Sequence, residues 1–372
     1  MRIGIPVMFA GRGAGGPEVY EVELLRALAL IDKESEYHVF CLNRRARSAI
    51  GVSAENFIFH EVWPEARILS MLTTLPFQIS KTRVDVLHTP VIPPPLVTQD
   101  YLMTLVCSTT FRHPEFYPPA IRVRLKALLH RGIRKSRLIL CVSNSVREHC
   151  AEAFRVPMER LRTVYLGASP RFQPVAEAEK RSLLKERFGL TVPYFLFSGR
   201  WEKRKNVARI LEAFALFKQQ TRLPHKMVLT GSRTWASKEV EATIASRHLA
   251  GDIVDLGKSP VADLPVLYAG ADALVFASLW EGFGMPIVEA MACGTPVITS
   301  NCSSMPEIAG DAGLLVDPYS PESIACAMRQ IGDNSALRAS LGAAGLARAK
   351  QFTWERCARE TLAAYRQFAL MA

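Results

Sequence analysis

Two carboxylates, Glu281 and Glu289, stand eight positions apart on either side of a glycine-rich turn. Pro286 suits a first helical position and Gly294 suits the left-handed position just past a helix end, which predicts a short helix over about 286–293. Glu289 then lies one turn into this helix, and Glu281 lies in the loop before it. Because sugars and riboses offer hydroxyls in pairs, we interpret both carboxylates as hydroxyl acceptors beside a bound phosphate.

The loop that carries this spacing follows an apolar run at 273–277, which is typical of a buried strand. Open α/β sheets bind ligands in loops at the carboxyl ends of their strands. The free N–H groups of a first helical turn attract an anion, and Gly282 and Gly284 let the backbone approach it. The alternative interpretation is structural, with one acid stabilising the helix dipole and the other solvated in the loop.

A basic segment follows the first strand-like run of the second half of the chain. Arg200 and Lys205 are predicted to reach the ligand-binding edge, and Asn206 to cap the helix that comes next. Their charges suit a diphosphate leaving group without a metal, since a guanidinium forms forked hydrogen bonds and an ammonium acts as a point charge. We expect Lys203 and Arg204 to be solvated neighbours. A wholly solvated loop is the structural alternative.

The size and composition of the chain favour two globular domains. It has 372 residues, of which 49% are hydrophobic, and no obvious repeat. The start of the chain lacks the pattern of a signal peptide and no run is long enough to span a bilayer, so we expect a cytoplasmic protein. The eight cysteines have neither C-x-x-C nor zinc-finger spacing, which predicts buried free thiols and no metal site.

The net charge of +11 is unevenly distributed. Nine arginines and lysines lie between Arg112 and Arg147, opposed only by Glu115. Apolar residues recur there at helical spacing, and they are Leu125, Leu128, Leu129 and Ile133. This pattern predicts peripheral contact with the inner face of the cytoplasmic membrane, and it comes with no nucleic-acid-binding motif. The alternative is an ordinary core-facing helix with a solvated basic face.

The order of the predicted elements is α/β throughout. Strand-like runs alternate with helical patterns in both halves, which indicates parallel sheets covered by helices. These runs are 2–5, 38–42, 57–60, 84–87, 103–107, 138–142 and 163–165, then 194–198, 227–230, 253–256, 273–277, 296–299 and 314–316. The first helix starts after Gly15 and Gly16 with Pro17 at its first position, and the spacing is not the dinucleotide-binding G-x-G-x-x-G.

The segment from Glu281 to Glu289 resembles the E-x7-E motif of the GT-B retaining glycosyltransferases, specifically family four. The similarity covers nearly the whole chain and is most specific in the second half. It continues through 290–298, 305–307, 310–316, 197–200, 204–206 and Gly15-Gly16. The resemblance implies two Rossmann-like domains facing across a cleft. Residues 1–173 with the returning helix 354–372 would form the acceptor side, and 174–353 would bind the nucleotide-sugar.

The resemblance also implies roles for individual side chains. Arg200 and Lys205 would bind the donor diphosphate, Glu281 the hydroxyls of the transferred sugar, and Glu289 the ribose. The reaction would retain the anomeric configuration and would need no metal and no cofactor, since the nucleotide-sugar is a substrate. Front-face attack, assisted by the leaving phosphate, is the mechanism we favour.

Backbone groups would complete the donor site. The resemblance implies contacts from the amides of Phe283, Gly284 and Met285. It further implies that Gly15 and Gly16 approach the phosphate from the first domain, so that domain closure assembles the site.

Two departures from the family pattern concern the sugar and the acceptor. The His-Asp pair frequent in the family is replaced by about Val106-Cys107, although the following 112–115 segment is preserved. The corresponding contact with the donor sugar is either absent or supplied from elsewhere, with His113 and His88 as the candidates. The family's Asn-Gly-Val-Asp is replaced at 166–169 by Leu-Gly-Ala-Ser.

The leading hypothesis is an enzyme that transfers a hexose to a lipid-linked or growing cell-envelope polysaccharide such as lipopolysaccharide. The resemblance favours mannose from GDP-mannose. One alternative keeps the fold but uses UDP-glucose or a related donor, or makes a soluble product. Another is a non-catalytic nucleotide-sugar-binding assembly partner, against which the intact Arg200, Lys205, Glu281 and Glu289 argue.

Overall fold

The computed structural model describes residues 1–234 and 236–371 of the chain. They form two compact units, each described below by itself. Unit 1 comprises Met1–Gly167 and the segment from Thr353 onward, and unit 2 comprises Ala168–Phe352. The predicted first boundary lay at residue 173. Residues 168–173 pack with unit 2, where the Ala168 amide donates to the Phe352 carbonyl at 3.2 Å.

Unit 1 is built on a seven-stranded parallel sheet with the strand order β3-β2-β1-β4-β5-β6-β7. Its strands are β1 (Arg2–Val7), β2 (Glu36–Cys41), β3 (Phe57–Glu61), β4 (Val86–Pro90), β5 (Leu102–Leu105), β6 (Leu138–Cys141) and β7 (Leu161–Thr163). Its helices are α1 (Gly16–Ile31), α2 (Arg45–Ile50), α3 (Arg67–Leu72), α4 (Thr74–Thr82), α5 (Thr109–Arg112), α6 (Pro119–Lys135), α7 (Asn144–Phe154) and α16 (Trp354–Leu370), with short 3-10 turns at Pro114–Phe116 and Met158–Arg160.

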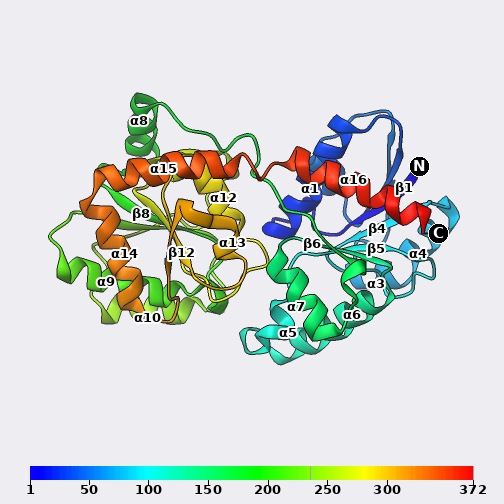
Figure 1. Ribbon diagram of the computed structural model, residues 1–372, viewed down its shortest axis with the longest axis horizontal. Coiled ribbons are helices and arrows are strands. Elements are labelled where there is room, and N and C mark those ends of the chain that lie inside the picture. The colour runs from blue at the N-terminus through cyan, green and yellow to red at the C-terminus, as the bar shows by residue number, and fades with distance from the viewer. Residues whose placement is uncertain (235, 372) are drawn as a thin grey trace. The chain divides into compact units, whose positions relative to one another are not determined.

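The last helix, α16, returns to unit 1 and packs against α1 (Figure 1). Its apolar face is buried, with Tyr365 fully enclosed. A chain of hydrogen bonds runs beneath it from Tyr20 through Thr104 and His88 to Tyr365, with distances of 2.6, 2.8 and 2.6 Å. Since buried polar groups are costly unless paired, this network specifies how α16 is seated.

Unit 2 is built on a six-stranded parallel sheet with the order β10-β9-β8-β11-β12-β13. Its strands are β8 (Tyr194–Ser198), β9 (Lys226–Thr230), β10 (Ile253–Asp255), β11 (Ala273–Phe276), β12 (Val297–Ser300) and β13 (Gly313–Val316). Its helices are α8 (Glu177–Phe188), α9 (Val207–Gln220), α10 (Ser237–Ser246), α11 (Leu264–Gly270), α12 (Met285–Ala292), α13 (Met305–Ala309), α14 (Pro321–Asp333) and α15 (Ser335–Ala349), with 3-10 turns at Lys203–Lys205, Val261–Asp263 and Gly310–Ala312.

The core of unit 2 lies between this sheet and its helices. Helix α9 packs against α10 and α14, whereas α12 packs against α11, α13 and α15 (Figure 1). Phenylalanines of β8 and α9 stack at the centre, with Phe195 and Phe217 edge to face at 5.2 Å. The apolar runs of the sequence predicted all thirteen strands found in the described residues, although β4 and β7 are displaced by about two residues. Apolar runs mark burial, and the register is set by the neighbouring strand, as in the pairing of Ile3 with Val86.

In both sheets the strand order reverses once. In unit 1 the reversal lies between β1 and β4, and in unit 2 between β8 and β11. The carboxyl ends of the strands on either side of such a reversal form the crevice in which open α/β sheets bind ligands. No helix in the described part of the chain has the length and apolar composition that crossing a bilayer requires.

Candidate functional site

The loops at the reversal point of unit 2 are joined to each other by backbone and amide hydrogen bonds. The Leu279 amide, in the loop after β11, donates to the Arg204 carbonyl in the loop after β8 at 2.7 Å. The Asn206 side chain donates to the carbonyls of Ala277 and Pro318, at 2.9 and 2.7 Å. Asn206 occupies the position directly before α9, as predicted, but its side chain does not cap the helix. Its φ of 62° turns the chain, and its amide is used by carbonyls of other loops instead.

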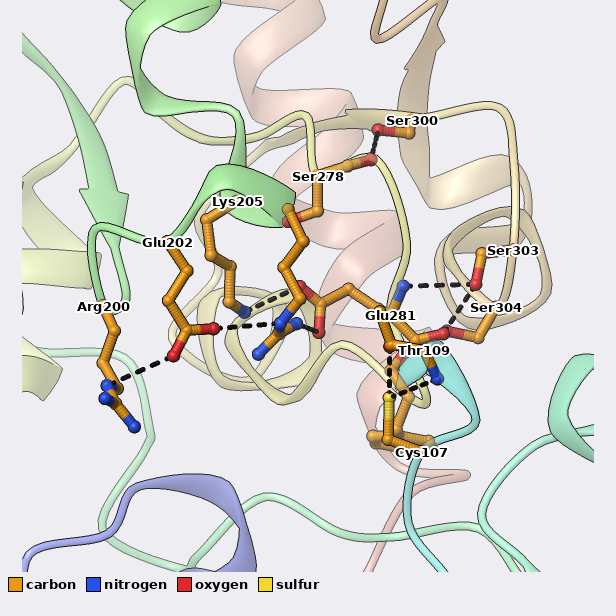
Figure 2. Close-up of polar contacts among 12 residues, drawn as sticks. Cys107, Thr109, Arg200, Glu202, Lys205, Ser278, Glu281, Ser300, Ser303 and Ser304 are labelled. Carbon is orange, nitrogen blue, oxygen red and sulfur yellow. Dashed lines mark hydrogen bonds and ion pairs between the residues drawn. The ribbon is translucent and has the colours of Figure 1, made fainter. Parts of the chain in front are cut away.

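A chain of alternating charges crosses this joined pair of loops (Figure 2). Glu281 binds two cations, with Lys205 Nζ at 2.7 Å from Oε1 and Arg204 Nη1 at 2.7 Å from Oε2. Glu202 in turn lies 3.0 Å from Arg204 and 3.3 Å from Arg200. Three cations and two carboxylates therefore share one corner of unit 2, leaving an excess of one positive charge.

Burial and pairing set the charge states in this cluster. Burial raises the pKa of Glu281, but Arg204 and Lys205 outweigh it and hold that pKa below its usual value. Burial lowers the pKa of Lys205, and Glu281 opposes this effect. The Lys205 ammonium also lies 4.4 Å from the centre of the Phe276 ring. The arrangement is a preformed, ionised carboxylate held between two cations.

Arg204 is a site residue that the sequence interpretation missed. It was expected to be a solvated neighbour, yet its side chain bridges Glu202 and Glu281 and is only 20% exposed. Arg200, named as the diphosphate ligand, is 50% exposed and reaches only Glu202 among the ion pairs of the described residues. Lys203, the other expected neighbour, is exposed as predicted.

The backbone that presents Glu281 is held by two serines from the loop after β12. Ser303 Oγ accepts from the Glu281 amide at 3.2 Å and donates to its carbonyl at 2.6 Å. Ser304 Oγ lies 3.1 Å from the Glu281 carbonyl and 2.9 Å from that of Phe283. The serine-rich sequence directly after a strand was the available signal, and it was not recognised.

Helix α12 begins and ends as the sequence predicted, within one residue. Gly284 precedes it with a φ of 99°, Pro286 occupies its first turn, and Gly294 follows its end with a φ of 75°. Met285 is its first residue, and Phe283 is buried against Phe352 at the loop end. The first turn of α12 therefore lies beside the charge cluster.

Glu289 lies on α12 and forms a hydrogen bond with the Tyr268 hydroxyl at 2.9 Å. Burial raises the pKa of Glu289 to about 7, although Tyr268, Lys205 and Arg171 oppose the shift. Glu281 and Glu289 thus differ in charge state near neutral pH, although the sequence analysis predicted the same role as hydroxyl acceptor for both. Tyr268 was not identified from the sequence, because it lies 21 positions away on α11.

The loop that carries Arg200 is in close contact with the loop after β9 at Gly231. Gly231 follows β9 with a φ of 142°, and a Cβ added there would lie 1.8 Å from the Gly199 carbonyl oxygen. The two loops approach so closely that only glycine fits at this position.

Gly15 and Gly16 lie in unit 1, at the loop between β1 and α1. Gly15 has a φ of 75°, and no atom lies within 4 Å of a Cβ added at either position, so the backbone there is open. Two carboxylates hold the rest of this loop. Glu21 accepts from the amides of Met8, Phe9 and Ala10, and Glu18 from those of Gly11 and Ala14, all at 2.6–2.9 Å.

The two histidines considered for the missing His-Asp contact have different environments. His88 has both ring nitrogens engaged in the buried network under α16, and burial lowers its pKa to about 3. It is therefore a structural residue, and the suggestion that it contacts the sugar was wrong. His113 forms a 2.9 Å hydrogen bond with Glu115 and stacks on Phe116. Cys107, at the position of the pair, forms a 2.6 Å contact with Thr109.

The described residues contain no cluster of three or more histidines, cysteines or acids that could hold a metal ion. They also contain no disulfide, since all eight cysteines are free, five of them buried.

Comparisons with known proteins agree with this geometry. Residues 14–172 match the family described as Glycosyltransferase Family 4, and residues 180–348 match Glycosyl transferases group 1. The O-antigen chain mannosyltransferase B of Escherichia coli is 38% identical over 257 residues, covering 69% of this chain and 67% of that protein. The O-antigen chain mannosyltransferase RfbU of Salmonella typhimurium strain LT2 is 26% identical, covering 59% and 58%.

Among solved structures, sucrose-phosphate synthase from Thermosynechococcus elongatus aligns with a TM-score of 0.81 at 21% identity, and the alignment covers 100% of both chains. That likeness concerns the fold. Together with the two family matches and the relative at 38% identity, it places the chain by descent and by architecture. The chain belongs to the group 1, family 4 glycosyltransferases and has the GT-B fold.

Proposed function

We propose that this glycosyltransferase transfers mannose from GDP-mannose, with retention of configuration, to a lipid-linked or growing polysaccharide acceptor. Two relatives, 38% and 26% identical to this chain, are named O-antigen chain mannosyltransferases, which supports the sugar and the acceptor class. The observation that carries the proposal is the buried Glu281 carboxylate, held ionised between Arg204 and Lys205 at the reversal point of unit 2.

The donor diphosphate is proposed to bind Arg200 and Lys205, with Arg204 as a third cation. Since each cation is already partnered by a carboxylate, the diphosphate would exchange with Glu202 at Arg200 and Arg204. The amides of Gly284 and Met285, at the start of α12, would add backbone donors. Three cations in a partly desolvated corner can stabilise a leaving diphosphate without a metal, so we propose metal-independent transfer.

The two glutamates would then divide the hydroxyls of the donor. Glu281, ionised and anchored through its backbone by Ser303 and Ser304, suits the hydroxyls of the transferred sugar. Glu289, farther along α12 and bonded to Tyr268, suits the ribose. The contribution of Gly15 and Gly16 to phosphate binding remains a prediction.

Calorimetric titration tests the donor assignment. We expect GDP to bind without magnesium and more tightly than UDP or ADP. Glu281→Gln should weaken the binding of GDP-mannose by about tenfold relative to that of GDP, because the hydrogen bonds to the sugar are lost for GDP-mannose alone, whereas the effect on Arg204 and Lys205 is common to both ligands. Glu239→Gln, an exposed acid on α10, is the matched control. Selective UDP binding would overturn the mannose assignment, and equal weakening of both ligands would overturn the sugar contact.

We also propose that α6 contacts an anionic membrane surface. Its apolar residues Leu129 and Ile133 are buried in unit 1, so contact would be electrostatic rather than by insertion. Its basic side chains line an open groove of about 620 Å³, formed by Phe111, Lys126, Ala127, His130, Arg131, Arg134 and Lys135. Each basic residue near such a surface contributes about 1 kcal/mol.

Sedimentation with vesicles tests the membrane contact. Binding should require anionic phospholipid, weaken with added salt, and fall when Lys126, Arg131 and Arg134 are changed to Gln. Changing Lys180, Arg181 and Lys185 on α8 to Gln removes the same charge elsewhere and is the control. Equal loss with both triple variants, or binding to neutral vesicles, would contradict the proposal.

A further inference from the structure

The reversal point of unit 1 carries a group of arginines that the function described above does not use. Arg12 lies in the loop after β1, and Arg67 is the first residue of α3. Arg124 lies on α6. The loops after β1 and β4 form the ligand crevice of this sheet, as those after β8 and β11 do in unit 2.

The side chains of Arg12 and Arg67 are both held in place by neighbouring groups. The Arg67 guanidinium carbon lies 5.4 Å from the centre of the Phe9 ring, and the backbone amide of Arg12 donates to the Phe9 carbonyl at 3.1 Å. Arg12 Nη2 donates to the Leu42 carbonyl at 2.9 Å and lies 3.5 Å from that of Glu65. Both guanidiniums are therefore oriented by the protein.

The charge of this group is not balanced by ion pairs. Within residues 1–234 and 236–371, no carboxylate forms an ion pair with Arg12, Arg67 or Arg124. Burial lowers the pKa of Arg67, and the positive charges of Arg12 and Arg124 lower it further, while Glu21 opposes the shift. Arg67 is half-buried and remains charged, so it lies in a field of like charges that an anion would relieve.

Most backbone amides of the loop after β1 are already engaged and are not available to an anion. Glu18 and Glu21 already occupy the amides of Met8, Phe9, Ala10, Gly11 and Ala14. The guanidinium side chains are therefore the main groups left for recognition, and their forked geometry suits the oxygens of phosphate groups.

The crevice is also open and locally strained. Space is free around Gly15 and Gly16 at the end of the loop. On the other side of the reversal, Val91 directly follows β4 with a φ of 64°, which is rare for a β-branched residue. Strained backbone of this kind persists where the surrounding structure imposes it, commonly at binding sites.

We propose that Arg12 and Arg67 bind a diphosphate or phosphate group carried by the acceptor. That the ligand is the acceptor rests on the proposed function, whereas anion binding at this place does not. Apolar side chains stand exposed next to Arg67 in the sequence, with Trp63, Ile68 and Leu69 between 51% and 69% accessible. An ester with an apolar chain would contact both groups.

Calorimetry of the full chain with inorganic pyrophosphate tests the site, in buffer containing physiological salt. Arg67→Gln should weaken pyrophosphate binding by about tenfold or more, since a forked charge-assisted contact is lost. Arg47→Gln is the matched control, because Arg47 lies over Phe59 at the same 5.4 Å. Arg200→Gln should leave this binding step unchanged and should affect GDP instead.

The outcomes separate this site from the donor site. Loss of pyrophosphate binding in Arg67→Gln with GDP binding intact supports the proposal, even if GDP proves to be the wrong nucleotide. Equal binding by Arg67→Gln and Arg47→Gln, or loss only in Arg200→Gln, would overturn it. Arg67→Lys keeps the positive charge but lacks the paired N–H groups of the guanidinium, so it should bind pyrophosphate more weakly than the unchanged protein. It replaces Arg67→Gln in the test if that variant fails to fold.

Farnesyl diphosphate distinguishes the two sources of such an anion. Tighter binding than pyrophosphate, also lost in Arg67→Gln, supports a lipid ester. Equal binding of the two ligands supports a soluble phosphate ester at the same arginines. Tight farnesyl diphosphate binding that Arg67→Gln does not change would place the ligand elsewhere and overturn the site.

Discussion

The two reversal points of this molecule have the same topology, but their positive charges are paired with carboxylates in only one of them. In unit 2, Arg200, Arg204 and Lys205 are matched by Glu202 and Glu281, which are built into the same loops. In unit 1, Arg12 and Arg67 lie at the equivalent place without a carboxylate in an ion pair among the described residues. The topology supplies a crevice in both units, but the loop sequences decide whether its charge is neutralised before a ligand arrives.

The two loops also differ in which backbone groups are already satisfied. In unit 1, Glu18 and Glu21 occupy amide groups, so the loop offers few donors. In unit 2, Ser303, Ser304 and Asn206 occupy carbonyl groups instead. Binding in unit 2 can therefore use both charges and backbone amides, whereas binding in unit 1 must rely mainly on side chains.

Removing the shared carboxylate of unit 2 should have the largest effect. Glu281→Ala leaves Lys205 and Arg204 without their common partner, and breaking a buried pair in this way costs about 4 kcal/mol. Hydrogen exchange of the peptides after β8 and β11 would measure the loss, and turnover should fall with it. Adding Lys205→Met should recover part of the stability, since the unpaired charge is then gone. A cost below 1 kcal/mol would mean that the cluster is not a stability element.

The corresponding test in unit 1 is Glu21→Ala. Three amides would lose their acceptor, and unsatisfied buried donors cost about 1–3 kcal/mol each, so we expect about 3 kcal/mol in hydrogen exchange of the loop after β1. Unit 2 peptides should be unaffected. If exchange rises equally in both units, the carboxylate does more than hold its own loop.

The same residue predicts a pH dependence. Burial raises the pKa of Glu21 from 4.5 to about 7, although three backbone hydrogen bonds oppose the shift. Because the folded pKa is the higher one, the folded state binds the proton more tightly. The stabilising contribution is therefore complete below about pH 4.5 and is lost as the pH rises to about 7. In urea unfolding, the free energy of unfolding of Glu21→Gln should depend less on pH between about 4.5 and 7 than that of the unchanged protein. An unchanged pH dependence would contradict the assignment.

A smaller effect, on GDP binding, should come from removing a carboxylate from unit 2, which leaves its cations less balanced, as they are in unit 1. Glu202→Gln removes the carboxylate that competes for Arg200 and Arg204, so GDP should bind up to about tenfold more tightly. Titration calorimetry with Glu239→Gln as control measures the change. Weaker GDP binding in Glu202→Gln would show that Glu202 positions the arginines rather than competing with the diphosphate.

The smallest predicted effect concerns strain at the unit 1 crevice. Val91→Gly relieves a left-handed conformation and should stabilise unit 1 by about 1 kcal/mol. Ile92→Gly, at the half-buried neighbour outside the left-handed region, should destabilise it. Thermal unfolding of the two variants gives the comparison, and a loss of stability in both would rule out stored strain at Val91.

The sequence was sufficient for the elements and for part of the site. The β-type apolar runs predicted every strand in the described residues, and the Pro286 and Gly294 signals placed α12 within one residue, because these features depend on local backbone geometry. Strand ends were less accurate, since pairing with a neighbour determines them. The side chain of Asn206 was assigned to the wrong partner, because its carbonyl acceptors lie 71 and 112 positions away.

What the sequence determined by itself is therefore the fold, the family and the position of Glu281, Glu289, Arg200 and Lys205 at a strand-to-helix edge. Only the tertiary structure decided which of those charges meet. Arg204 became a partner of Glu281 across 77 positions, and His88 became a core residue bonded to Tyr365 across 277. Charge type and local spacing are properties of the chain. Ion pairing and burial depend on the loops that the sheets bring together, and ion pairing and burial set the pKa of each group.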